Sequence, residues 1–398
     1  SYIMKKILFM IINMNIGGME KALLNMINKM DKKQYEITIL MLEEYGGFIK
    51  DIPSHVKKEY MSGYKNIKRV LNQPPRYIIY ELIKDKSYIK AFNIFFLTLI
   101  TKILGDRTLF FKYIFKSYSK DSKIYDLAIA YAGPTDYITY YVLDKINARK
   151  KVQWIHFDVS KVGFNKQFAK NKYKKFDKIF LVSNEAKSKL ISEVPSLKEK
   201  VDIFYNIISN EEIKKSLLKA DGFNDNFKGI RILTVGRLSF EKGQDMSIKA
   251  AKMLFENGID FRWYCIGEGN QRKNYEKLIK EYDLNKRFIL LGSNNNPYKY
   301  MEECDIYVQS SRHEGYCITL AEARILNKPI VTTNFTGARE QIIHEKTGLI
   351  CDCNESSIYT QVRRLIECNN LRYEFKKNLK YANGIEQNHL YKLDNIIN

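Results

Sequence analysis

Two glutamates eight residues apart, Glu314 and Glu322, form the pattern in this sequence that most clearly suggests chemistry. Glu314 follows an apolar strand predicted over 306–309, and a helix-like run links it to Glu322. Open α/β sheets bind ligands at the carboxyl ends of their strands, so Glu314 is placed for binding. The backbone amides after it would open a helix, which is a natural phosphate site. The residues that contribute these amides are Gly315, Tyr316, Cys317 and Ile318.

The spacing of the two glutamates argues against a glycosidase acid/base pair. Eight helical residues rise about 12 Å, whereas the two carboxyls of a glycosidase lie roughly 5–9.5 Å apart. If the segment is helical throughout, the pair suits an elongated ligand, with sugar hydroxyls at one end, ribose hydroxyls at the other and a diphosphate between them. The other interpretation of each glutamate is a structural carboxylate on a loop or helix.

Arg237 and Lys242 lie in the turn that follows a strand predicted over 231–235. Two fixed cations at such a turn would stabilise the negative charge that develops on a diphosphate leaving group. Glu268 lies in a Gly-Glu-Gly turn after the next strand, 261–266, where the backbone could approach a nucleotide closely. This turn and the polar loop 292–296 could equally be plain turns.

The first half of the chain offers two further candidates. Gly17 and Gly18 follow the first predicted strand and would let the loop approach phosphates or a sugar, although the pattern is not G-x-G-x-x-G. His156 ends a strand predicted over 151–155 and would face a cleft between the two halves. The alternative for His156 is a hydrogen-bonded histidine of the core.

These candidates can act together only if strands and helices bring them to the same edges of a sheet, and the chain shows the alternation of strands and helices that this requires. Short apolar runs alternate with amphipathic segments throughout the 398 residues, which predicts an α/β fold with two doubly wound, Rossmann-like domains facing a cleft. We expect an acceptor-binding domain over 1–208, a nucleotide-sugar domain over 209–370, and helices over 371–398 that pack back on the first domain. The strands expected are 6–12, 36–41, 127–131, 151–155, 178–182 and 201–205 in the first half, and 231–235, 261–266, 288–291, 306–309 and 329–332 in the second.

Charge is distributed unevenly between the halves. The chain carries a formal charge of +21, and residues 1–210 account for +17 of it. Such an excess implies an acidic partner: a nucleic acid, an anionic membrane or a phosphorylated substrate. No nucleic-acid reading motif is present, so no nucleic-acid partner is expected. The six cysteines show no metal-binding spacing and are expected to be buried, reduced thiols, with Cys351 and Cys353 on one face of a strand.

Residues 64–123 interrupt the pattern, because they contain no clear parallel strand. From Lys86 to Lys120 there are seven basic residues and one acid, with aromatic residues between them. Two interpretations are open: a pair of helices that contacts a membrane surface, or an ordinary helical insertion packed on the core. The lysine run over 161–178 likewise suits either a solvated face or a patch for an acceptor phosphate.

Together these residues resemble the GT-B glycosyltransferases of family 4, the group 1 glycosyl transferases, which are retaining enzymes. The resemblance spans residues 5–350 and includes Pro329-Ile330-Val331 and Thr336-Gly337-Ala338-Arg339-Glu340. It implies that Arg237 and Lys242 bind the donor diphosphate, Glu314 the donor sugar and Glu322 the ribose, with His156 near the anomeric carbon. It also implies that neither metal nor cofactor is needed. The chain departs from the family at Asn327, where a glycine is usual, and in the 64–123 insertion.

The function expected is transfer of a sugar, with retained configuration, from a nucleotide sugar, most simply a UDP-sugar, to an acceptor hydroxyl. The basic first half suggests a glycan or lipid-linked acceptor of cell-surface polysaccharide assembly. The protein is expected in the cytoplasm, and a location at the inner face of the cell membrane is a second interpretation. The opening apolar run 7–12 is too short for the core of a signal peptide, so no signal peptide is expected. The longest apolar stretch, 91–100, is too short to span a membrane, so no membrane span is expected. The alternatives are a non-enzymatic polyanion or nucleic-acid binder and another GT-B enzyme, a phosphorylase or an epimerase.

Overall fold

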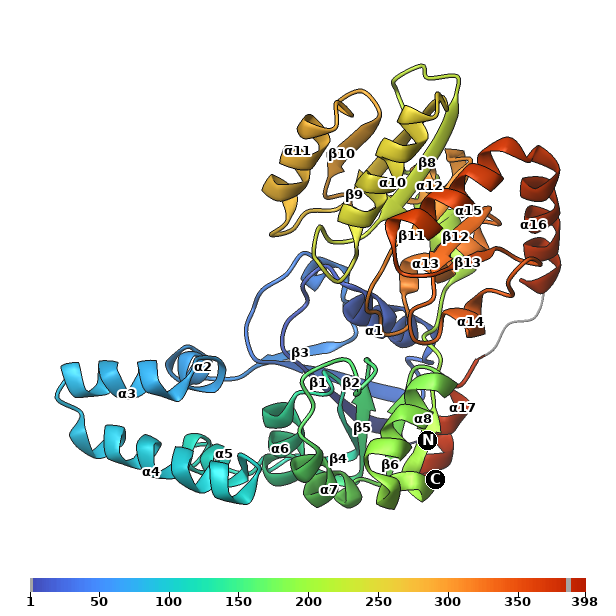
Figure 1. Cartoon of the computed structure of the whole chain (residues 1–398). Helices are drawn as coiled ribbons and strands as arrows, with labels where there is room; N and C mark the ends of the chain where they lie inside the picture. The colour runs from blue at the N-terminus through green and yellow to red at the C-terminus, as the bar shows by residue number, and fades with distance from the viewer. Residues whose placement is uncertain (1–2, 384–387) are drawn as a thin grey trace. The chain divides into compact units, whose positions relative to one another are not determined.

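The chain forms two compact units, each built on one parallel sheet (Figure 1). The computed structural model describes residues 3–383 and 388–398. The first unit comprises Ser1–Tyr205 and His389–Asn398, and the second comprises Asn206–Asn388. The prediction of two α/β domains with parallel, Rossmann-like sheets is therefore confirmed.

The sheet of the first unit has seven parallel strands in the order β3-β2-β1-β4-β5-β6-β7. The central strand β1 pairs with β2 on one side and β4 on the other, so the order reverses there. Its apolar residues are fully buried because helices cover both faces. The strands are β1 (Lys5–Ile11), β2 (Tyr35–Met41), β3 (Lys57–Tyr60), β4 (Ile124–Ala130), β5 (Asn147–Ile155), β6 (Lys178–Leu181) and β7 (Val201–Ile203).

The interruption after β3 consists of four consecutive helices, α2 to α5, and no strand. Helix α4 is the longest of them and packs against α3 and α5. The helices of the first unit are α1 (Gly18–Lys29), α2 (Tyr64–Asn72), α3 (Pro75–Lys84), α4 (Tyr88–Leu104), α5 (Thr108–Ile114), α6 (Asp136–Lys145), α7 (Lys166–Lys172), α8 (Asn184–Glu193) and α17 (Tyr391–Ile397). Among the described residues, none of the helices combines the length and the apolar character needed to cross a bilayer.

The second unit contains a six-stranded parallel sheet in the order β10-β9-β8-β11-β12-β13. Its order reverses between β8 and β11, the two strands that precede Arg237 and Glu314. The strands are β8 (Ile230–Val235), β9 (Phe261–Ile266), β10 (Phe288–Gly292), β11 (Ile306–Gln309), β12 (Ile330–Thr333) and β13 (Leu349–Cys351). The helices are α9 (Asn210–Leu217), α10 (Gln244–Glu256), α11 (Arg272–Glu281), α12 (Tyr298–Glu303), α13 (Ile318–Ile325), α14 (Ala338–Gln341), α15 (Glu355–Glu367) and α16 (Asn369–Ala382).

The C-terminal segment differs from the expectation that residues 371–398 pack together on the first domain. Helix α16 belongs to the second unit, where it contacts α13 and α15. Only His389–Asn398, with α17, belongs to the first unit. There the Lys392 ammonium donates to the Asp202 carboxylate at 3.2 Å, beside the edge strand β7.

The short strand β3 is absent from the sequence prediction, and β13 was expected only as a strand that would contain Cys351 and Cys353. Strand β3 has the sequence Lys-Lys-Glu-Tyr and lies at the edge of the sheet, where polar side chains are common. It therefore lacks the apolar run from which a strand is predicted. Strand β13 has three residues and ends at Cys351, which is buried, whereas Cys353 lies beyond the strand and is exposed. Cys368 is exposed too, so the expectations of six buried thiols and of a shared face for Cys351 and Cys353 were wrong.

Candidate functional site

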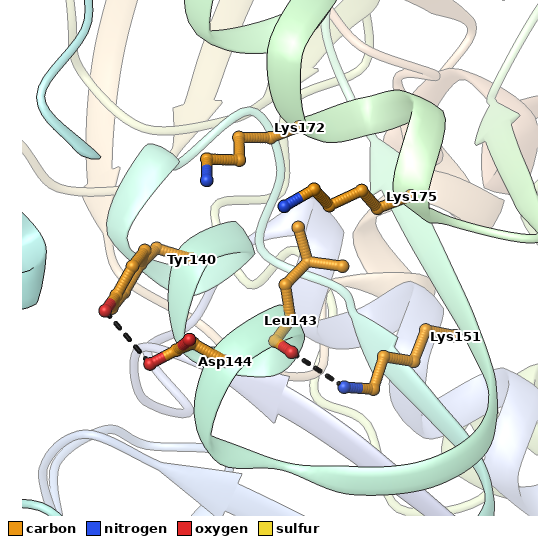
Figure 2. A pocket seen from close by; sticks show the side chains of 6 residues that line it. All are labelled: Tyr140, Leu143, Asp144, Lys151, Lys172 and Lys175. Atoms are coloured by element: carbon orange, nitrogen blue, oxygen red, sulfur yellow. Dashed lines mark hydrogen bonds between the residues drawn. The ribbon is translucent and has the colours of Figure 1, made fainter.

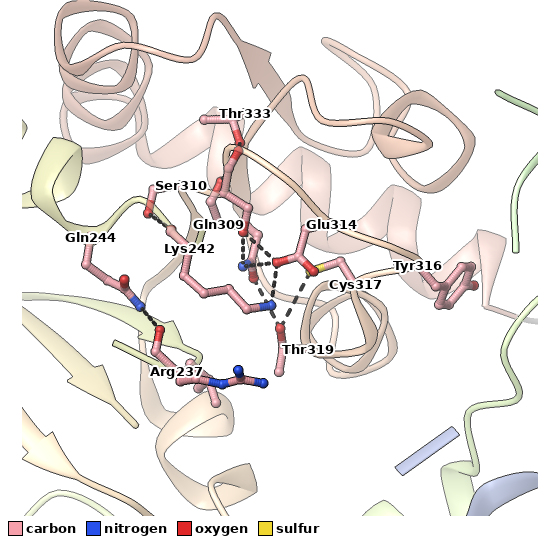
Figure 3. A network of polar contacts seen from close by, with 12 residues as sticks. Arg237, Lys242, Gln244, Gln309, Ser310, Glu314, Tyr316, Cys317, Thr319 and Thr333 are labelled. Atoms are coloured by element: carbon pink, nitrogen blue, oxygen red, sulfur yellow. Dashed lines mark hydrogen bonds and ion pairs between the residues drawn. The ribbon is translucent and has the colours of Figure 1, made fainter. Parts of the chain in front are cut away.

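The loop between β11 and α13 places Glu314 at the carboxyl edge of the second sheet (Figure 3). The carboxylate is buried, and its Oε1 accepts from the Ser311 hydroxyl at 2.6 Å and from the Gln309 amide at 3.4 Å. In the part of the chain that the structure describes, no hydrogen bond reaches Oε2. The loop and Lys242 therefore hold Glu314 through one of its two carboxylate oxygens.

The turn after β8 brings Lys242 to the same carboxylate. The Lys242 ammonium donates to Glu314 Oε1 at 2.6 Å, and its side chain is 26% exposed against 6% for Glu314. Burial by itself lowers the pKa of the Lys242 ammonium, but the Glu314 carboxylate outweighs this effect and the pKa lies above its ordinary value. Lys242 is therefore a fixed cation at this sheet edge.

Further contacts hold the β8 turn and the β11 loop together. Arg312 makes two hydrogen bonds of 2.7 Å to the Asp245 carboxylate, and the Ser310 hydroxyl donates to the Lys242 carbonyl at 2.9 Å. Gly243 has φ +68°, and a Cβ there would lie 2.1 Å from the Ser310 carbonyl oxygen. A side chain at this position would push the two loops apart.

Arg237 lies in the same turn but is exposed. Its carbonyl accepts from the Gln244 amide at 2.8 Å, which anchors the backbone. Its guanidinium makes no hydrogen bond or ion pair within residues 3–383 and 388–398. Figure 3 shows the Arg237 side chain below Lys242, so the two cations occupy one side of the network.

The segment 315–318 differs from the expected continuous helix. Helix α13 begins only at Ile318, and Cys317 adopts φ +61° and ψ +79° just before it. The separation of about 12 Å expected for eight helical residues therefore does not apply, because Gly315, Tyr316 and Cys317 belong to the loop. Burial raises the pKa of the Cys317 thiol, so it stays protonated. Figure 3 shows the Tyr316 ring directed away from Lys242.

Glu322 lies on α13 with its carboxylate buried. It accepts a short hydrogen bond from the hydroxyl of Tyr298, the first residue of α12. Burial and the Glu322 carboxylate raise the pKa of the Tyr298 hydroxyl well above its ordinary value, so it remains a donor. This contact fixes the orientation of Glu322.

Glu268 occupies the turn after β9, where Gly267 adopts φ +146° and approaches the Gly236 carbonyl too closely for a Cβ. The Leu238 amide donates to the Glu268 carbonyl at 3.0 Å, which ties this turn to the β8 turn. The Glu268 carboxylate is exposed and pairs with Arg272 at 2.5 Å. The backbone of Glu268 therefore lies at the same sheet edge as Arg237 and Glu314, while its side chain is held by Arg272 of α11.

In the first unit, His156 follows β5 and is buried. Its Nε2 donates to the Tyr131 carbonyl at 2.6 Å, and the two rings meet edge to face with centroids 4.6 Å apart. Burial lowers the pKa of His156 to about 4 despite this hydrogen bond, so the imidazole is neutral. With the proton on Nε2, Nδ1 can only accept a hydrogen bond.

Tyr131 also connects His156 to the turn that holds Gly17 and Gly18. The Tyr131 hydroxyl donates to the Met19 carbonyl at 3.3 Å, in the first turn of α1. Gly17 precedes α1 with φ −162°, an extended conformation open to any residue. Gly17, Gly18 and His156 thus lie at the carboxyl edge of one sheet. Tyr131 contacts both His156 and the first turn of α1, which follows the two glycines.

The lysine run over 161–178 contributes to a small cavity of about 220 Å³ on the first unit (Figure 2). Lys151, Lys172 and Lys175 line it together with Asp144, and the Lys151 ammonium donates to the Leu143 carbonyl at 2.9 Å. Burial, with Lys120 nearby, lowers the pKa of Lys151 to about 8. Lys172 and Lys175 therefore line a hollow, while the other lysines of the run, Lys161, Lys166, Lys170, Lys174 and Lys178, do not contribute to it.

Sequence reasoning missed the residues that position the candidates. Ser311 and Gln309 hold Glu314, Tyr298 holds Glu322, and Tyr131 holds His156. Ser311 and Gln309 could have been suspected, because polar residues at the end of a buried strand need partners. Tyr298 and Tyr131 are distant in sequence from the residues they contact and carry no local signal.

The site can now be compared with known proteins. Residues 211–381 match the family model described as glycosyl transferases group 1. A Campylobacter jejuni relative is 32% identical over 210 residues, which cover 52% of this chain and 56% of that protein; it is named N-acetylgalactosamine-N,N'-diacetylbacillosaminyl-diphospho-undecaprenol 4-alpha-N-acetylgalactosaminyltransferase. The capsular polysaccharide biosynthesis glycosyltransferase CapM of Staphylococcus aureus is 28% identical, over 37% of this chain and 39% of its own. The chain spans about half the length, or less, of these curated relatives.

Solved structures resemble the chain over almost its whole length. HepE of Anabaena, in complex with UDP and glucose, has 17% identity and a TM-score of 0.68, with 98% of each chain covered. TarM of S. aureus has 16% identity and a TM-score of 0.68, with 99% of this chain and 100% of the other covered. At these identities the likeness concerns the fold. Residues 211–381 thus match the glycosyl transferases group 1 family, and the two parallel-sheet units of the chain have the GT-B fold.

Proposed function

We propose that this protein transfers a sugar from a nucleotide sugar to an acceptor hydroxyl, with retention of the anomeric configuration and without a metal ion. The observation that carries the proposal is the Lys242–Glu314 pair at 2.6 Å, held at the point where the strand order of the second sheet reverses. Ligands of open α/β sheets bind at such points. A cation and a carboxylate side by side suit a ligand that contains both phosphate and sugar hydroxyls.

Each residue has a distinct role in this proposal. Lys242 and the exposed Arg237 bind the diphosphate, whose negative charge grows as the sugar leaves. Glu314 accepts from sugar hydroxyls through Oε2, and Glu322, oriented by Tyr298, accepts from the ribose. The backbone amides of the segment 315–318 face the phosphates, where the dipole of α13 adds positive potential.

Retention follows if the acceptor attacks from the face that the diphosphate leaves. The bond between the anomeric carbon and the phosphate oxygen breaks with its electron pair on the phosphate, the acceptor oxygen forms the new bond, and the departing phosphate takes the acceptor proton. His156 is neutral at physiological pH and can only accept through Nδ1. In the proposal it orients a sugar hydroxyl near the anomeric carbon and does not act as a general acid.

The donor and acceptor are proposed from chemistry and from the relatives. UDP is the proposed nucleotide, because HepE of similar fold is described with UDP and glucose. A lipid-linked or anionic glycan is the proposed acceptor, because residues 1–210 carry a formal charge of +17 and the C. jejuni relative is named for a diphospho-undecaprenol acceptor. Both observations support a role for the proposed enzyme in bacterial cell-surface polysaccharide assembly.

A thermal-shift panel of UDP, GDP, ADP and their sugars tests the donor site. A ligand of the folded chain raises Tm by mass action, so UDP compounds should raise it more than GDP or ADP compounds, and Glu314→Gln should reduce the response to the sugar nucleotide more than that to UDP. UDP release with acceptor, in EDTA, then tests the reaction. Equal responses to all nucleotides would contradict the donor assignment, and EDTA inhibition reversed by metal would contradict metal independence.

A further inference from the structure

An exposed apolar surface lies on the helical hairpin formed by α3 and α4. Twelve of the 26 large apolar side chains that are exposed among the described residues lie between Tyr77 and Leu109. Ile89 is 79% exposed, Phe92 65% and Ile103 82%. Scattered exposed apolar residues are ordinary, but a contiguous patch on one element marks an interaction surface.

The exposed residues of α4 form a stripe along one side of the helix. They recur at intervals of three and four residues, which brings them to one face. The opposite face is buried on the protein through Ala91 and Ile94. The rings of Phe92 and Phe96 stack with centroids 6.3 Å apart, so the stripe is continuous through its middle. Its members are Tyr88, Phe92, Phe95, Phe96, Leu99 and Ile103.

The neighbouring helix α3 carries three further exposed apolar residues, Tyr77, Tyr80 and Ile83, spaced by three residues. Figure 1 shows α3 and α4 side by side, joined by a turn at the end of the hairpin that is farthest from the strands of the first sheet. The patch therefore occupies a projecting part of the first unit and not a face covered by its own core.

Basic residues flank this surface and have no acidic partners. Lys84, Lys86 and Lys90 lie at or beside the turn between the helices, and Lys102 follows Phe95 by two helical turns. All four are exposed, and none takes part in an ion pair in the described part of the chain. Glu81 pairs with Arg69, and the exposed Asp85 lies between Lys84 and Lys86, so the turn keeps a net positive charge. The surface thus combines aromatic and aliphatic side chains with unpaired positive charge.

We propose that the α3–α4 hairpin docks on the surface of an anionic lipid bilayer, with the stripe in the headgroup region and the lysines on lipid phosphates. Aromatic rings favour the interface between water and acyl chains, and clustered lysines are attracted by anionic lipid. The unpaired lysines favour a membrane over a second copy of this positively charged chain, whose hairpin would bring like charges together. The inference does not depend on the transfer reaction.

Co-sedimentation with vesicles tests the proposal on the full chain in the absence of donor. Vesicles of phosphatidylcholine with phosphatidylglycerol should bind the protein at low salt, and pure phosphatidylcholine vesicles should bind it at least tenfold more weakly. The variant Phe92→Ser/Phe96→Ser should lower binding to anionic vesicles about tenfold or more. Lys84→Glu/Lys86→Glu should lower it by a similar factor and reduce its dependence on salt.

The matched control is Tyr373→Ser/Tyr381→Ser, which removes two exposed aromatic residues of α16 in the second unit. It should bind as the unaltered chain does, within about twofold. Absence of binding to both kinds of vesicle, or an equal loss in the control, would overturn the proposal. So would a chain that is dimeric and indifferent to vesicles but becomes monomeric with Phe92→Ser/Phe96→Ser, since the stripe would then bind a second copy. Sugar transfer to a soluble acceptor, assayed separately, distinguishes failure of docking from failure of the proposed enzyme.

Discussion

Lys242 is the residue whose removal should affect the proposed reaction most directly. Its ammonium is the partner of a carboxylate that is 6% exposed. We expect Lys242→Met, which keeps the stem and removes the charge, to lower kcat about 10²–10³-fold, because losing one preorganised donor to developing negative charge costs about 2.7–4 kcal/mol. Initial rates of nucleoside diphosphate release, at saturating donor, measure the effect.

Lys252→Met is the matched control, since Lys252 lies on the following helix in a surface ion pair with Glu256. Surface pairs contribute about 0–1 kcal/mol, so its rate should stay within a few-fold of the unaltered chain. Turnover of Lys242→Met close to that of the control would remove Lys242 from the site.

His156 makes the stability of the first unit depend on pH. Burial lowers its pKa to about 4 from an ordinary 6.5, so the unfolded chain binds more protons between these values. The contribution to stability is fully present above pH 6.5 and is lost as pH falls towards 4. Between pH 7 and 4.5 the free energy of unfolding should fall by about 2 kcal/mol more in the unaltered chain than in His156→Gln, which does not titrate.

Urea denaturation at each pH, with both chains carrying Trp263→Phe so that the buried Trp154 is the reporter, measures this difference. The glutamine variant is the control for every carboxylate that titrates in the same range. Identical pH slopes for the two chains would show that His156 is not buried as a neutral imidazole.

At the scale of elements, the close approach of the β8 turn and the β11 loop predicts that Gly243 tolerates no side chain. Gly243→Ala meets both an unfavourable φ of +68° and the Ser310 carbonyl at 2.1 Å. We expect a loss of at least about 3 kcal/mol in the free energy of unfolding, because the backbone must move. Urea denaturation in the Trp154→Phe background, followed by the fluorescence of Trp263, which is buried in the second unit, measures this loss.

Gly258 serves as the control that separates the cost of the positive φ from the cost of the close contact. It has φ +71°, and a Cβ there would meet nothing within 4 Å. Gly258→Ala should therefore cost only the backbone term, about 1–2 kcal/mol. If Gly243→Ala and Gly258→Ala lowered the free energy of unfolding equally, the two loops at Gly243 would be able to move apart at no additional cost.

Elements with strong apolar runs were predictable from the sequence, and those defined by tertiary contacts were not. β9 and β11 were expected with the bounds that the structure gives them, because buried parallel strands are almost continuously apolar. β3 is polar, and nothing local shows that it pairs with β2. Asn327, where a glycine is usual in the family, adopts φ +56°: asparagine tolerates the left-handed conformation that ends α13.

The candidate site follows the same rule. Gly-Arg and Glu-Gly motifs mark Arg237 and Glu314, since strand ends and turns have sequence signals. The start of α13 at Ile318 was not predictable, because the left-handed conformation of Cys317 depends on packing around it. The partnership of Tyr131 with His156 joins residues 25 apart, and only the pairing of β4 with β5 brings them together.

At the scale of the whole molecule, the chain passes between the two units twice. It leaves the first unit after Tyr205 and returns at His389. The returning segment is anchored at three points: the Tyr205 amide donates to His389 Nδ1 at 3.2 Å, Lys392 donates to the Ile203 carbonyl at 2.7 Å, and Leu393 is 1% exposed. Helix α17 therefore stabilises the edge of the first sheet with residues that come last in the sequence.

Each unit carries one of the two tryptophans, so the effect of α17 can be assigned to a unit. Trp263→Phe leaves Trp154 as the reporter of the first unit, and Trp154→Phe leaves Trp263 as the reporter of the second. Leu393→Ala removes a buried side chain, which costs about 2–5 kcal/mol. We expect the urea midpoint reported by Trp154 to fall accordingly, while the midpoint reported by Trp263 stays unchanged. Asn395→Ala, at an exposed position of α17, should leave both midpoints in place. Equal shifts at both tryptophans would mean that the two units unfold together, and that α17 stabilises the whole chain and not one sheet.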